Sequence, residues 1–413
     1  MSCYHILQDH QDKIFPEFEI SVKKTEHPEE PQLKYGYNSK LNEYRNIIDN
    51  IDSEIWKKVR WYINDYDFLV KDPIINRAFY KYWEIINEFE LFEHYDEESF
   101  DLILHCAEAP GGFIQGTNIY LQIDRLNNQN FKFLPKQTPD EDGFITINKK
   151  KKKNKQLFRI YTISLNKDLP QYKTYNLPSY NKNIINKHVC IVYGKDNTGD
   201  INNLENIHYI EKLAEKPFYL ITADGGFDEG TEFNNKEQLH YSLILNEIYS
   251  AIKLQKQDGH FVLKVFDIFT DTSIHLLYLL HLAYKEVYIY KPKTSRPTNS
   301  EKYVICKHFC LSNKNKTTLL YCLGNVSCAI SKLKCKYLSF KLFKEIPEPF
   351  VHDILTMNSQ LLEKQCSCLQ QAVDLCKDTH FLDEYDQLIA NSIERRKMVF
   401  QEWEQLYNLQ PYV

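Results

Sequence analysis

Apolar residues recur every three or four positions in the first quarter of the chain, a spacing that predicts helices. One set precedes Val59 and contains Ile47, Ile48, Ile51, Ile55 and Trp56. A second set follows Pro73 and contains Ile75, Ala78, Phe79, Trp83, Ile86 and Phe89. Residues 1 to about 40 are polar and include Pro28 and Pro31, so we expect a loosely packed arm there.

Short apolar runs in the middle of the chain predict strands. They cover residues 101–106, 158–165, 189–193, 218–222, 261–266, 287–290 and 303–306. Helical patterns separate several of them, from about Phe113 and over 238–254 and 274–284. Strands that alternate with helices predict an α/β fold, a parallel-rich sheet with helices on both faces. In such sheets ligands bind at the carboxyl ends of the strands.

The pattern divides the chain into an arm, a main domain and an extension. We expect the α/β domain over 41–320 and a mainly helical extension over 321–413, with helices at 354–375 and 381–409 that pack against the core. Residues 127–156 are polar and predict a loop inserted between two strands. Its lysine run, 149–153, is typical of a solvated loop, and in an RNA-binding enzyme it could contact phosphates.

Composition narrows the class of protein. The 413 residues are 43% hydrophobic and 26% charged with a net charge of −5, so a nucleic-acid contact would need a local basic patch. The 11 cysteines lack the paired spacing of zinc sites, which favours reduced, buried thiols over a metal site at Cys306/Cys310 or at Cys322, Cys328 and Cys335. The N-terminus has no signal pattern, and the longest apolar stretch, 276–284, is too short to span a bilayer. We therefore expect a soluble intracellular protein without membrane contacts.

A glycine turn follows the first strand, in the sequence Cys106-Ala-Glu-Ala-Pro-Gly-Gly-Phe113. Paired glycines let the backbone approach a ligand, although a purely structural turn would look the same. The turn lacks the G-x-G-x-x-G spacing of dinucleotide binders and the Lys-Ser/Thr of a phosphate-binding loop. It favours a nucleoside-type cofactor without phosphates and disfavours NAD-dependent redox chemistry.

Three ionisable residues lie near other strand ends. Asp224 precedes Gly225-Gly226 and is either a helix cap or a catalytic group. Lys264 lies inside the apolar run 261–266, where a buried ammonium must be paired or tuned, unless an edge strand lets it reach water. Glu301 precedes the 303–306 strand and is either an ordinary exposed residue or a partner of Lys264.

Together these motifs resemble the FtsJ-like ribose 2′-O-methyltransferases, most closely the branch that methylates the first transcribed nucleotide of capped mRNA. Residues 109–113 resemble that family's S-adenosylmethionine loop, and 194–201 its Gly-x-Asp-Gly-Thr-Gly-Asp-Ile segment, with Asn197 where Gly is usual. Residues 222–227, 259–266 and 291–307 resemble its later motifs. The resemblance extends from about Ile74 to Lys307.

The resemblance implies a Rossmann-like methyltransferase fold with a mostly parallel seven-stranded sheet, S-adenosylmethionine as cofactor and no metal. It also implies RNA as substrate, most closely the 5′ end of capped mRNA. The implied cofactor-binding residues are Cys106, Glu108, Ala109, Pro110, Gly111, Gly112, Phe113, Asp200 and Asp224, with Asp200 near the adenine.

The family's catalytic Lys-Asp-Lys-Glu tetrad maps onto Lys81, Asp224, Lys264 and Glu301. Lys81 follows from the family's Arg-Ala-x-x-Lys pattern, and the nearby Lys71 is the alternative. A free lysine has a pKa of about 10.4, so we expect Lys81 and burial to lower the pKa of Lys264. Lys264 would then accept the hydroxyl proton or steer the oxygen's lone pair, with Asp224 and Glu301 orienting the amine.

Other interpretations stay open at this point. One is a 2′-O-methyltransferase of ribosomal or transfer RNA. Another is a degenerate domain that serves as a non-catalytic subunit of a capping or virion complex, although all four tetrad positions are filled. The Asn- and Lys-rich composition suggests an AT-rich genome. The overall layout resembles the enzymes of large cytoplasmic DNA viruses, which implies a cytoplasmic, viral-factory or virion location and a capping-machinery partner. With 29 Tyr and 24 Phe, the residue that would stack on a cap guanine stays open.

Overall fold

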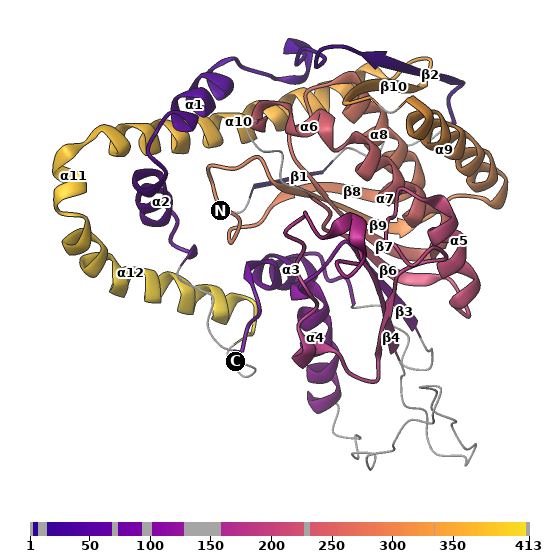
Figure 1. Cartoon of the computed structure of the whole chain (residues 1–413), viewed down its shortest axis with the longest axis horizontal. Coiled ribbons are helices and arrows are strands. Elements are labelled where there is room, and N and C mark those ends of the chain that lie inside the picture. The colour runs from indigo at the N-terminus through magenta and orange to yellow at the C-terminus, as the bar shows by residue number, and fades with distance from the viewer. Residues whose placement is uncertain are drawn as a thin grey trace.

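The computed structural model describes residues 3–6, 15–67, 73–92, 101–127, 158–226, 232–333 and 335–409. Residues 128–156 of the predicted inserted loop, Lys71 and Phe227 therefore lie outside the described residues. An eight-stranded sheet runs through the centre (Figure 1), in the order β1-β8-β9-β7-β6-β3-β4-β5. Its strands are β1 (Cys3–Ile6), β3 (Asp101–Cys106), β4 (Phe158–Ile163), β5 (Val189–Val192), β6 (Phe218–Ala223), β7 (Gln255–Val265), β8 (Tyr284–Lys291) and β9 (Lys302–Phe309).

Most of this sheet is parallel. Strands β5, β4, β3, β6 and β7 pair in parallel, and β9 inserts antiparallel between β7 and β8. These seven strands confirm the predicted Rossmann-like methyltransferase sheet. The short β1 adds an eighth strand, antiparallel to β8, which the polar N-terminal sequence did not indicate.

Helices cover both faces of the sheet, as predicted. On one face α3 (Arg77–Glu88) and α4 (Gly112–Asn127) bury aromatic residues that include Phe79, Trp83 and Phe113. On the other lie α5 (Leu204–Leu213), α7 (Tyr241–Leu254) and α8 (Asp271–Ala283), whose apolar residues form the larger core cluster. The helix predicted over 238–254 is interrupted at His240, between α6 (Lys236–Leu239) and α7.

The predicted loose arm is wrong for part of the N-terminal segment. Strand β2 (Phe18–Thr25) pairs antiparallel with β10 (Tyr337–Phe343), and Phe18 and Val22 pack against the larger core cluster. The partner strand lies more than three hundred residues away along the chain. The alternation of Phe18, Ile20 and Val22 with polar residues was the available local signal, which the prediction of a polar arm did not use.

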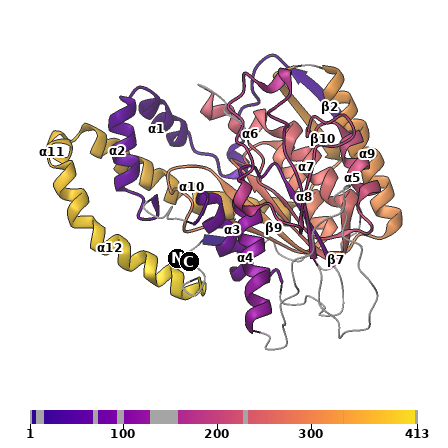
Figure 2. The same ribbon diagram turned by 60° about the horizontal axis from the view of Figure 1, so that its bottom comes forward.

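The C-terminal region adds α9 (Asn313–Leu333) and an arch of three helices, α10 (Glu348–Lys377), α11 (Thr379–Asp383) and α12 (Tyr385–Leu406). Figures 1 and 2 show α10 running beside α1 (Lys40–Asp49) and α2 (Ser53–Tyr62), the chain turning at α11, and α12 returning toward α3. We call residues 348–406 the helical arch. It contains the helix predicted at 354–375 within α10, whereas the helix predicted at 381–409 is divided between α11 and α12. Among the described helices, none has the length and apolar content to span a membrane.

The end of the arch is fixed to α3. Trp403 Nε1 donates to Glu84 Oε2 at 3.2 Å, and Trp83 Nε1 donates to the carbonyl oxygen of Tyr407 at 2.9 Å. The ring of Trp403 also stacks on Phe400 and meets Tyr80 edge-on. These contacts join segments more than three hundred residues apart along the chain.

We expect Trp403→Ala to lower the free energy of unfolding by about 3–5 kcal/mol, because it removes a large buried side chain and leaves a cavity. Trp403 is only 2% exposed. Denaturant unfolding measures the change. The control is Leu406→Ala on the same helix, where the side chain is 57% exposed and the expected change is below about 0.5 kcal/mol. Equal losses in the two variants would contradict the packing described for the arch.

Candidate active site

The structure brings the four candidate catalytic residues together at one edge of the sheet. Asp224 directly follows β6, Lys264 lies on β7, Glu301 directly precedes β9, and Lys81 lies on α3. Lys264 Nζ is 3.3 Å from Asp224 Oδ1, and Lys81 Nζ is 2.6 Å from Glu301 Oε1. All four side chains are at most 15% exposed. They form two adjoining ion pairs, and the edge-strand alternative for Lys264 is wrong because β7 lies between β6 and β9.

Backbone and side-chain contacts hold Asp224 and Lys264 in place. Lys264 Nζ donates to the carbonyl oxygen of Asp224 at 2.7 Å, in addition to its ion pair with the carboxylate. Tyr303, opposite Lys264 in the β7–β9 register, donates its hydroxyl to Asp224 Oδ1 at 3.0 Å. A Cβ at Gly226 would lie 3.3 Å from Lys264 Nζ, so glycine leaves room for the ammonium.

Lys81 reaches Glu301 because α3 packs closely against the start of α4. A Cβ on Gly112 would lie 2.3 Å from Asn76 Oδ1 and 2.8 Å from the backbone nitrogen of Phe79. Glycine therefore permits the close approach of the two helices, and Asn76 caps α3 through a bond from the backbone N–H of Ala78. The structure thus places Lys81 against Glu301, while the alternative, Lys71, lies outside the described residues.

The expected lowering of the lysine pKa is wrong for this arrangement. Burial does lower the pKa of Lys264, but Asp224 and Glu301 outweigh it, and the net shift is upward. Burial raises the pKa of Glu301, yet Lys81, Lys264 and Lys291 hold it far below its usual range. Glu301 thus neutralises Lys81, and Lys264 meets more negative than positive charge.

A fifth ionisable residue, Glu247 on α7, belongs to this cluster and was missed by the sequence analysis. It is 1% exposed, and a Cβ at Gly225 would lie 2.2 Å from its Oε1. Burial raises its pKa to about 8, against the opposing effect of Lys264. A carboxylate in the middle of a helix rich in apolar residues was the available signal.

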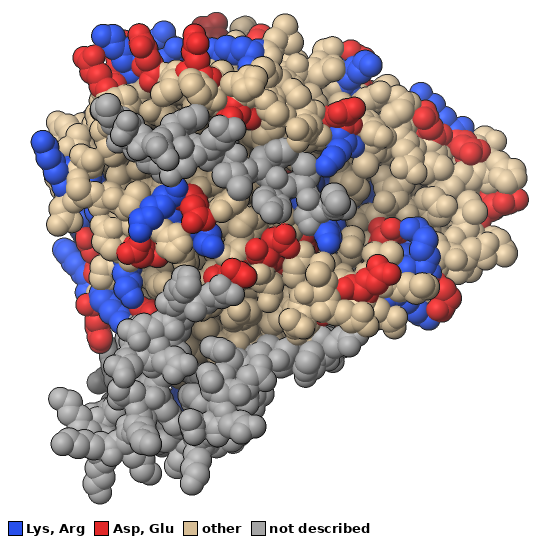
Figure 3. Space-filling model, turned by 180° about the vertical axis from the view of Figure 1, so that it is seen from behind, with Lys and Arg blue, Asp and Glu red and all other residues tan. Residues whose placement is uncertain are grey.

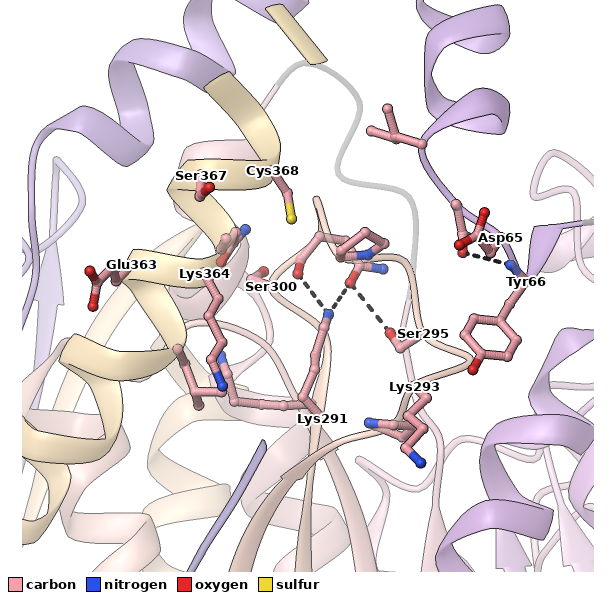
Figure 4. A pocket seen from close by; sticks show the side chains of 18 residues that line it. Asp65, Tyr66, Lys291, Lys293, Ser295, Ser300, Glu363, Lys364, Ser367 and Cys368 are labelled. Carbon is pink, nitrogen blue, oxygen red and sulfur yellow. Dashed lines mark hydrogen bonds between the residues drawn. The ribbon is translucent and has the colours of Figure 1, made fainter. Parts of the chain in front are cut away.

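Two further residues hold Glu301: Lys291 at the end of β8 and Ser295 in the loop between β8 and β9. Figure 4 labels both side chains. Ser295 Oγ donates to Glu301 Oε1 at 3.0 Å, and Lys291 Nζ donates to the backbone oxygens of Asn299 and Glu301 at 2.8 and 2.7 Å. Burial lowers the pKa of Lys291 to about 7. Both residues lie in the motif over 291–307, but the sequence analysis assigned them no role.

Glu84 on α3 fixes the other end of this loop. Its carboxylate accepts the backbone N–H groups of Lys293 at 2.6 Å and Thr294 at 3.3 Å, and the hydroxyl of Tyr290. The same carboxylate accepts Trp403 Nε1 from the helical arch. One buried side chain thus joins α3, the β8–β9 loop and the arch.

The glycine turn after β3 forms a second part of the site. Glu108 is 2% exposed; its Oε1 accepts the backbone N–H of Phe113 at 2.9 Å, while its Oε2 has no hydrogen-bond partner among the described residues. Ala109 N donates to Ser164 Oγ at 3.2 Å, and the Pro110 carbonyl accepts from Asn181 N at 3.0 Å. Gly111 has a φ of +116°, a conformation that favours glycine.

Two residues of the predicted cofactor set have packing roles. The Cys106 side chain is fully buried in the larger core cluster, and its carbonyl oxygen accepts the Asp224 N–H at 3.2 Å. Phe113 is also fully buried and stacks on Tyr82, with ring centroids 4.5 Å apart. Their buried side chains support the glycine turn from the protein interior.

Asp200 lies on the loop after β5, at the same sheet edge. Its Oδ1 accepts the backbone N–H of Asn202 at 2.9 Å. In this loop Asn197 has a φ of +62°, the left-handed region that Asn tolerates better than most residues, which explains how it replaces glycine. Gly199 packs so closely on Ser164 that a Cβ would lie 1.9 Å from its carbonyl oxygen.

The comparison with protein families decides the identity of this arrangement. The profile of the FtsJ-like methyltransferase family matches residues 74–309, more than half of the chain. The chain belongs to the FtsJ-like methyltransferase family. The matched segment begins just before α3 and ends with β9, so it contains Lys81, Asp224, Lys264, Glu301 and the glycine turn.

Curated relatives of this FtsJ-like chain carry cap-specific names. It is 28% identical over 279 residues to cap-specific mRNA (nucleoside-2′-O-)-methyltransferase 2 of Mus musculus, covering 65% of this chain and 33% of the relative. It is 40% identical over 119 residues to cap-specific mRNA (nucleoside-2′-O-)-methyltransferase 1 of the same species, covering 28% and 14%. A third relative, methyltransferase 1A of Caenorhabditis briggsae, is 30% identical over 204 residues, covering 46% and 23%. The chain thus spans a third or less of the length of these relatives.

S-adenosylmethionine is the cofactor of the FtsJ-like family, and the residues present fit it. This cofactor carries a sulfonium, an ammonium and two ribose hydroxyls, all of which favour carboxylate partners. Glu108, Asp200 and Asp224 follow three strands of one sheet edge. The buried Glu108 Oε2, without a partner among the described residues, is an acceptor available to such a ligand.

Proposed function

We propose that this chain transfers a methyl group from S-adenosylmethionine to a ribose 2′-hydroxyl of RNA, at the first transcribed nucleotide of capped mRNA. The reaction type is supported by two ion pairs beside the glycine turn, Lys264 with Asp224 and Lys81 with Glu301. The cap-specific names of the relatives support the choice of substrate.

The proposed catalysis depends on positioning. When bound, S-adenosylmethionine supplies the methyl group. Lys264, as an ammonium, donates a hydrogen bond to the 2′-oxygen, which fixes one lone pair and leaves the other available for the displacement. The carboxylate and the backbone carbonyl of Asp224 hold the ammonium in one orientation.

The raised pKa of Lys264 favours steering over proton abstraction, the two roles that the sequence left open. A lysine that keeps its proton at neutral pH cannot be the base. The hydroxyl becomes strongly acidic as its oxygen gains the methyl group, so a weak base suffices late in the reaction. The Asp224 carboxylate, 3.3 Å from Lys264 Nζ, is suited to accept that proton.

The pH dependence of the chemical step distinguishes the two roles. If Lys264 steers as an ammonium, single-turnover rates rise by less than tenfold in total between about pH 6.5 and 9, whereas a lysine base gives about tenfold per pH unit. The pKa of Glu247, about 8, falls inside this window. Its carboxylate forms as the pH rises and holds the Lys264 ammonium more firmly, so we expect a small step near that pH. Glu247→Gln should remove the step, and a log-linear slope of one would contradict steering.

The function is tested by methyl transfer from radiolabelled S-adenosylmethionine to a short RNA with an N7-methylguanosine cap, beside the same RNA without it. We expect label only on the capped RNA, at the 2′-oxygen of the first nucleotide. Equal label on both RNAs would indicate another RNA substrate, such as ribosomal or transfer RNA. Cofactor binding without any transfer would indicate a non-catalytic subunit.

A further inference from the structure

Thr294, in the loop between β8 and β9, is bound to α3 through all three of its hydrogen-bonding atoms. Its backbone N–H and its hydroxyl donate to Glu84 Oε2 at 3.3 and 3.2 Å. Its carbonyl oxygen accepts a hydrogen bond from Arg77 Nη2 at 2.7 Å. Thr294 is only 2% exposed, so these contacts are shielded from water. The loop is therefore fixed to α3 at the residue that directly precedes Ser295.

Ser295 connects this fixed point to the catalytic cluster. Its hydroxyl donates to Glu301 Oε1 at 3.0 Å, and the same oxygen pairs with Lys81 Nζ at 2.6 Å. Lys81 and Glu84 are three residues apart on α3, so their side chains leave the helix on the same side. One helix thus holds both partners of the Lys81–Glu301 pair, the lysine directly and the glutamate through the loop.

The Glu84 carboxylate is fully buried, and among the described residues no cationic side chain forms an ion pair with it. Hydrogen bonds take the place of a counter-ion. Oε1 accepts the N–H of Lys293 at 2.6 Å and the hydroxyl of Tyr290, and Oε2 accepts Trp403 Nε1 at 3.2 Å beside the two groups of Thr294. Burial raises the pKa of Glu84, and hydrogen bonds from Tyr290, Lys293 and Trp403 oppose that rise. A buried carboxylate is costly without such donors, so each of them helps to fix its orientation.

We infer that Glu84 is a positioning residue for methyl transfer, and that Trp403 of the helical arch holds Glu84 in the orientation that the reaction needs. Glu84 fixes the loop, and the loop places Ser295 and Glu301 opposite Lys81. The inference rests on the proposed function for the reaction that is measured. It adds a contact from residue 403, beyond the segment 74–309 that matches the family, to the geometry of the catalytic cluster.

Glu84→Gln tests the inference directly, because it keeps the size of the side chain and replaces one acceptor oxygen by a donor. We expect the single-turnover rate with saturating cofactor to fall by about tenfold to a hundredfold, since small displacements of catalytic groups have effects of that size. Binding of S-adenosylmethionine should change by less than about threefold, because the glycine turn is not altered. Trp403→Phe is the milder variant, which keeps an aromatic ring and removes the N–H donor. Its expected loss of rate is about threefold to tenfold.

Glu88→Gln is the matched control, one turn further along α3. Glu88 is exposed, and its Oε2 accepts the hydroxyl of Tyr407 at 3.1 Å, so it contacts the residue that follows α12. Among the described residues it has no hydrogen bond to the β8–β9 loop. Basic and acidic side chains are mixed on the described surface in Figure 3, so the loss of one exposed charge changes no large patch. The rate of Glu88→Gln should stay within about twofold of the wild type. A loss equal to that of Glu84→Gln would overturn the inference.

Two double variants test the order of the contacts. If Trp403 acts through Glu84, Trp403→Phe should cause no further loss of rate in the Glu84→Gln background. If Glu84 acts through Ser295, the variant with both Glu84→Gln and Ser295→Ala should lose less than the product of the two single losses. A general loss of stability would not produce these patterns, because the rates are compared per folded protein. Fully multiplicative losses in either pair would overturn the inference.

Hydrogen exchange separates this result from the proposed function. Glu84 accepts the backbone N–H groups of Lys293 and Thr294, so Glu84→Gln should speed the exchange of these two groups, Trp403→Phe should do so less, and Glu88→Gln should not. If the wild-type chain methylates no capped RNA, the proposed function fails, and the exchange still shows whether Glu84 and Trp403 fix the loop. Unchanged exchange in Glu84→Gln would refute the inference, as would faster exchange with an unchanged rate of methyl transfer.

Discussion

Lys264→Met should reduce the single-turnover rate of methyl transfer by at least about a thousandfold, equivalent to roughly 4 kcal/mol of barrier. Methionine keeps the length and the apolar stem of the side chain but removes the charge and the three donors. In the wild type the ammonium contacts both the carboxylate and the carbonyl oxygen of Asp224. Without it, nothing in the catalytic cluster would orient the 2′-oxygen in the manner that we propose.

A cofactor-binding measurement and a surface control variant show whether the loss of rate in Lys264→Met is specific to the chemical step. Equilibrium binding of S-adenosylmethionine should change by less than about threefold, because the loss concerns the reacting hydroxyl. Lys285→Met is the control, since that lysine is 58% exposed and pairs with an exposed Asp258. Its rate should equal that of the wild type. More than a tenth of the wild-type rate in Lys264→Met would refute the assigned role.

Asp224→Asn should lower the rate by about a hundredfold to a thousandfold and also weaken cofactor binding. Asparagine keeps the shape of the side chain and the backbone carbonyl, so the change isolates the negative charge. Losing that charge removes the strongest attraction that raises the pKa of Lys264. The pKa of Lys264 should therefore fall. Because Lys264 acts as an ammonium, the rate of the variant should decrease at high pH more steeply than that of the wild type.

Tyr303→Phe separates the charge of Asp224 from its orientation. The Tyr303 hydroxyl donates a hydrogen bond at 3.0 Å to Asp224 Oδ1, the oxygen that also pairs with Lys264 Nζ. Phenylalanine removes this hydrogen bond and leaves the carboxylate charged, so we expect a loss of less than about tenfold. If Tyr303→Phe and Asp224→Asn had equal effects, the orientation of the carboxylate would matter more than its charge.

Much of the fold was predictable because the strands of the α/β domain are local apolar runs. The runs at 101–106 and 218–222 agree with β3 and β6 to within one residue. The glycine turn and Asp224 follow such strands, Lys264 lies on one and Glu301 directly precedes one, so their convergence could be expected from the topology. The match to the family confirms the resemblance on which the mapping of Lys81 depended.

The remaining features depend on contacts between distant parts of the chain. Strand β2 forms because it pairs with β10. Arg60 and Arg296 are more than two hundred residues apart along the chain, yet burial and the charge of Arg296 lower the pKa of Arg60. The direction of the Lys264 pKa shift depends on the number of carboxylates around it, including Glu247 from a separate helix. A single sequence displays charged residues, but it does not display which of them share a cavity.

The contact between Trp403 and Glu84 closes the helical arch into a ring. Its two ends are held together only by non-covalent contacts, and their effective concentration depends on the covalent continuity of α10, α11 and α12. A single cleavage of the chain at α11 would leave α12 on a separate fragment. That fragment would then have to associate with the rest of the protein non-covalently. Because Glu84 also fixes the loop that leads to Glu301, such a cut far from the chemistry would make the geometry of the active site dependent on protein concentration.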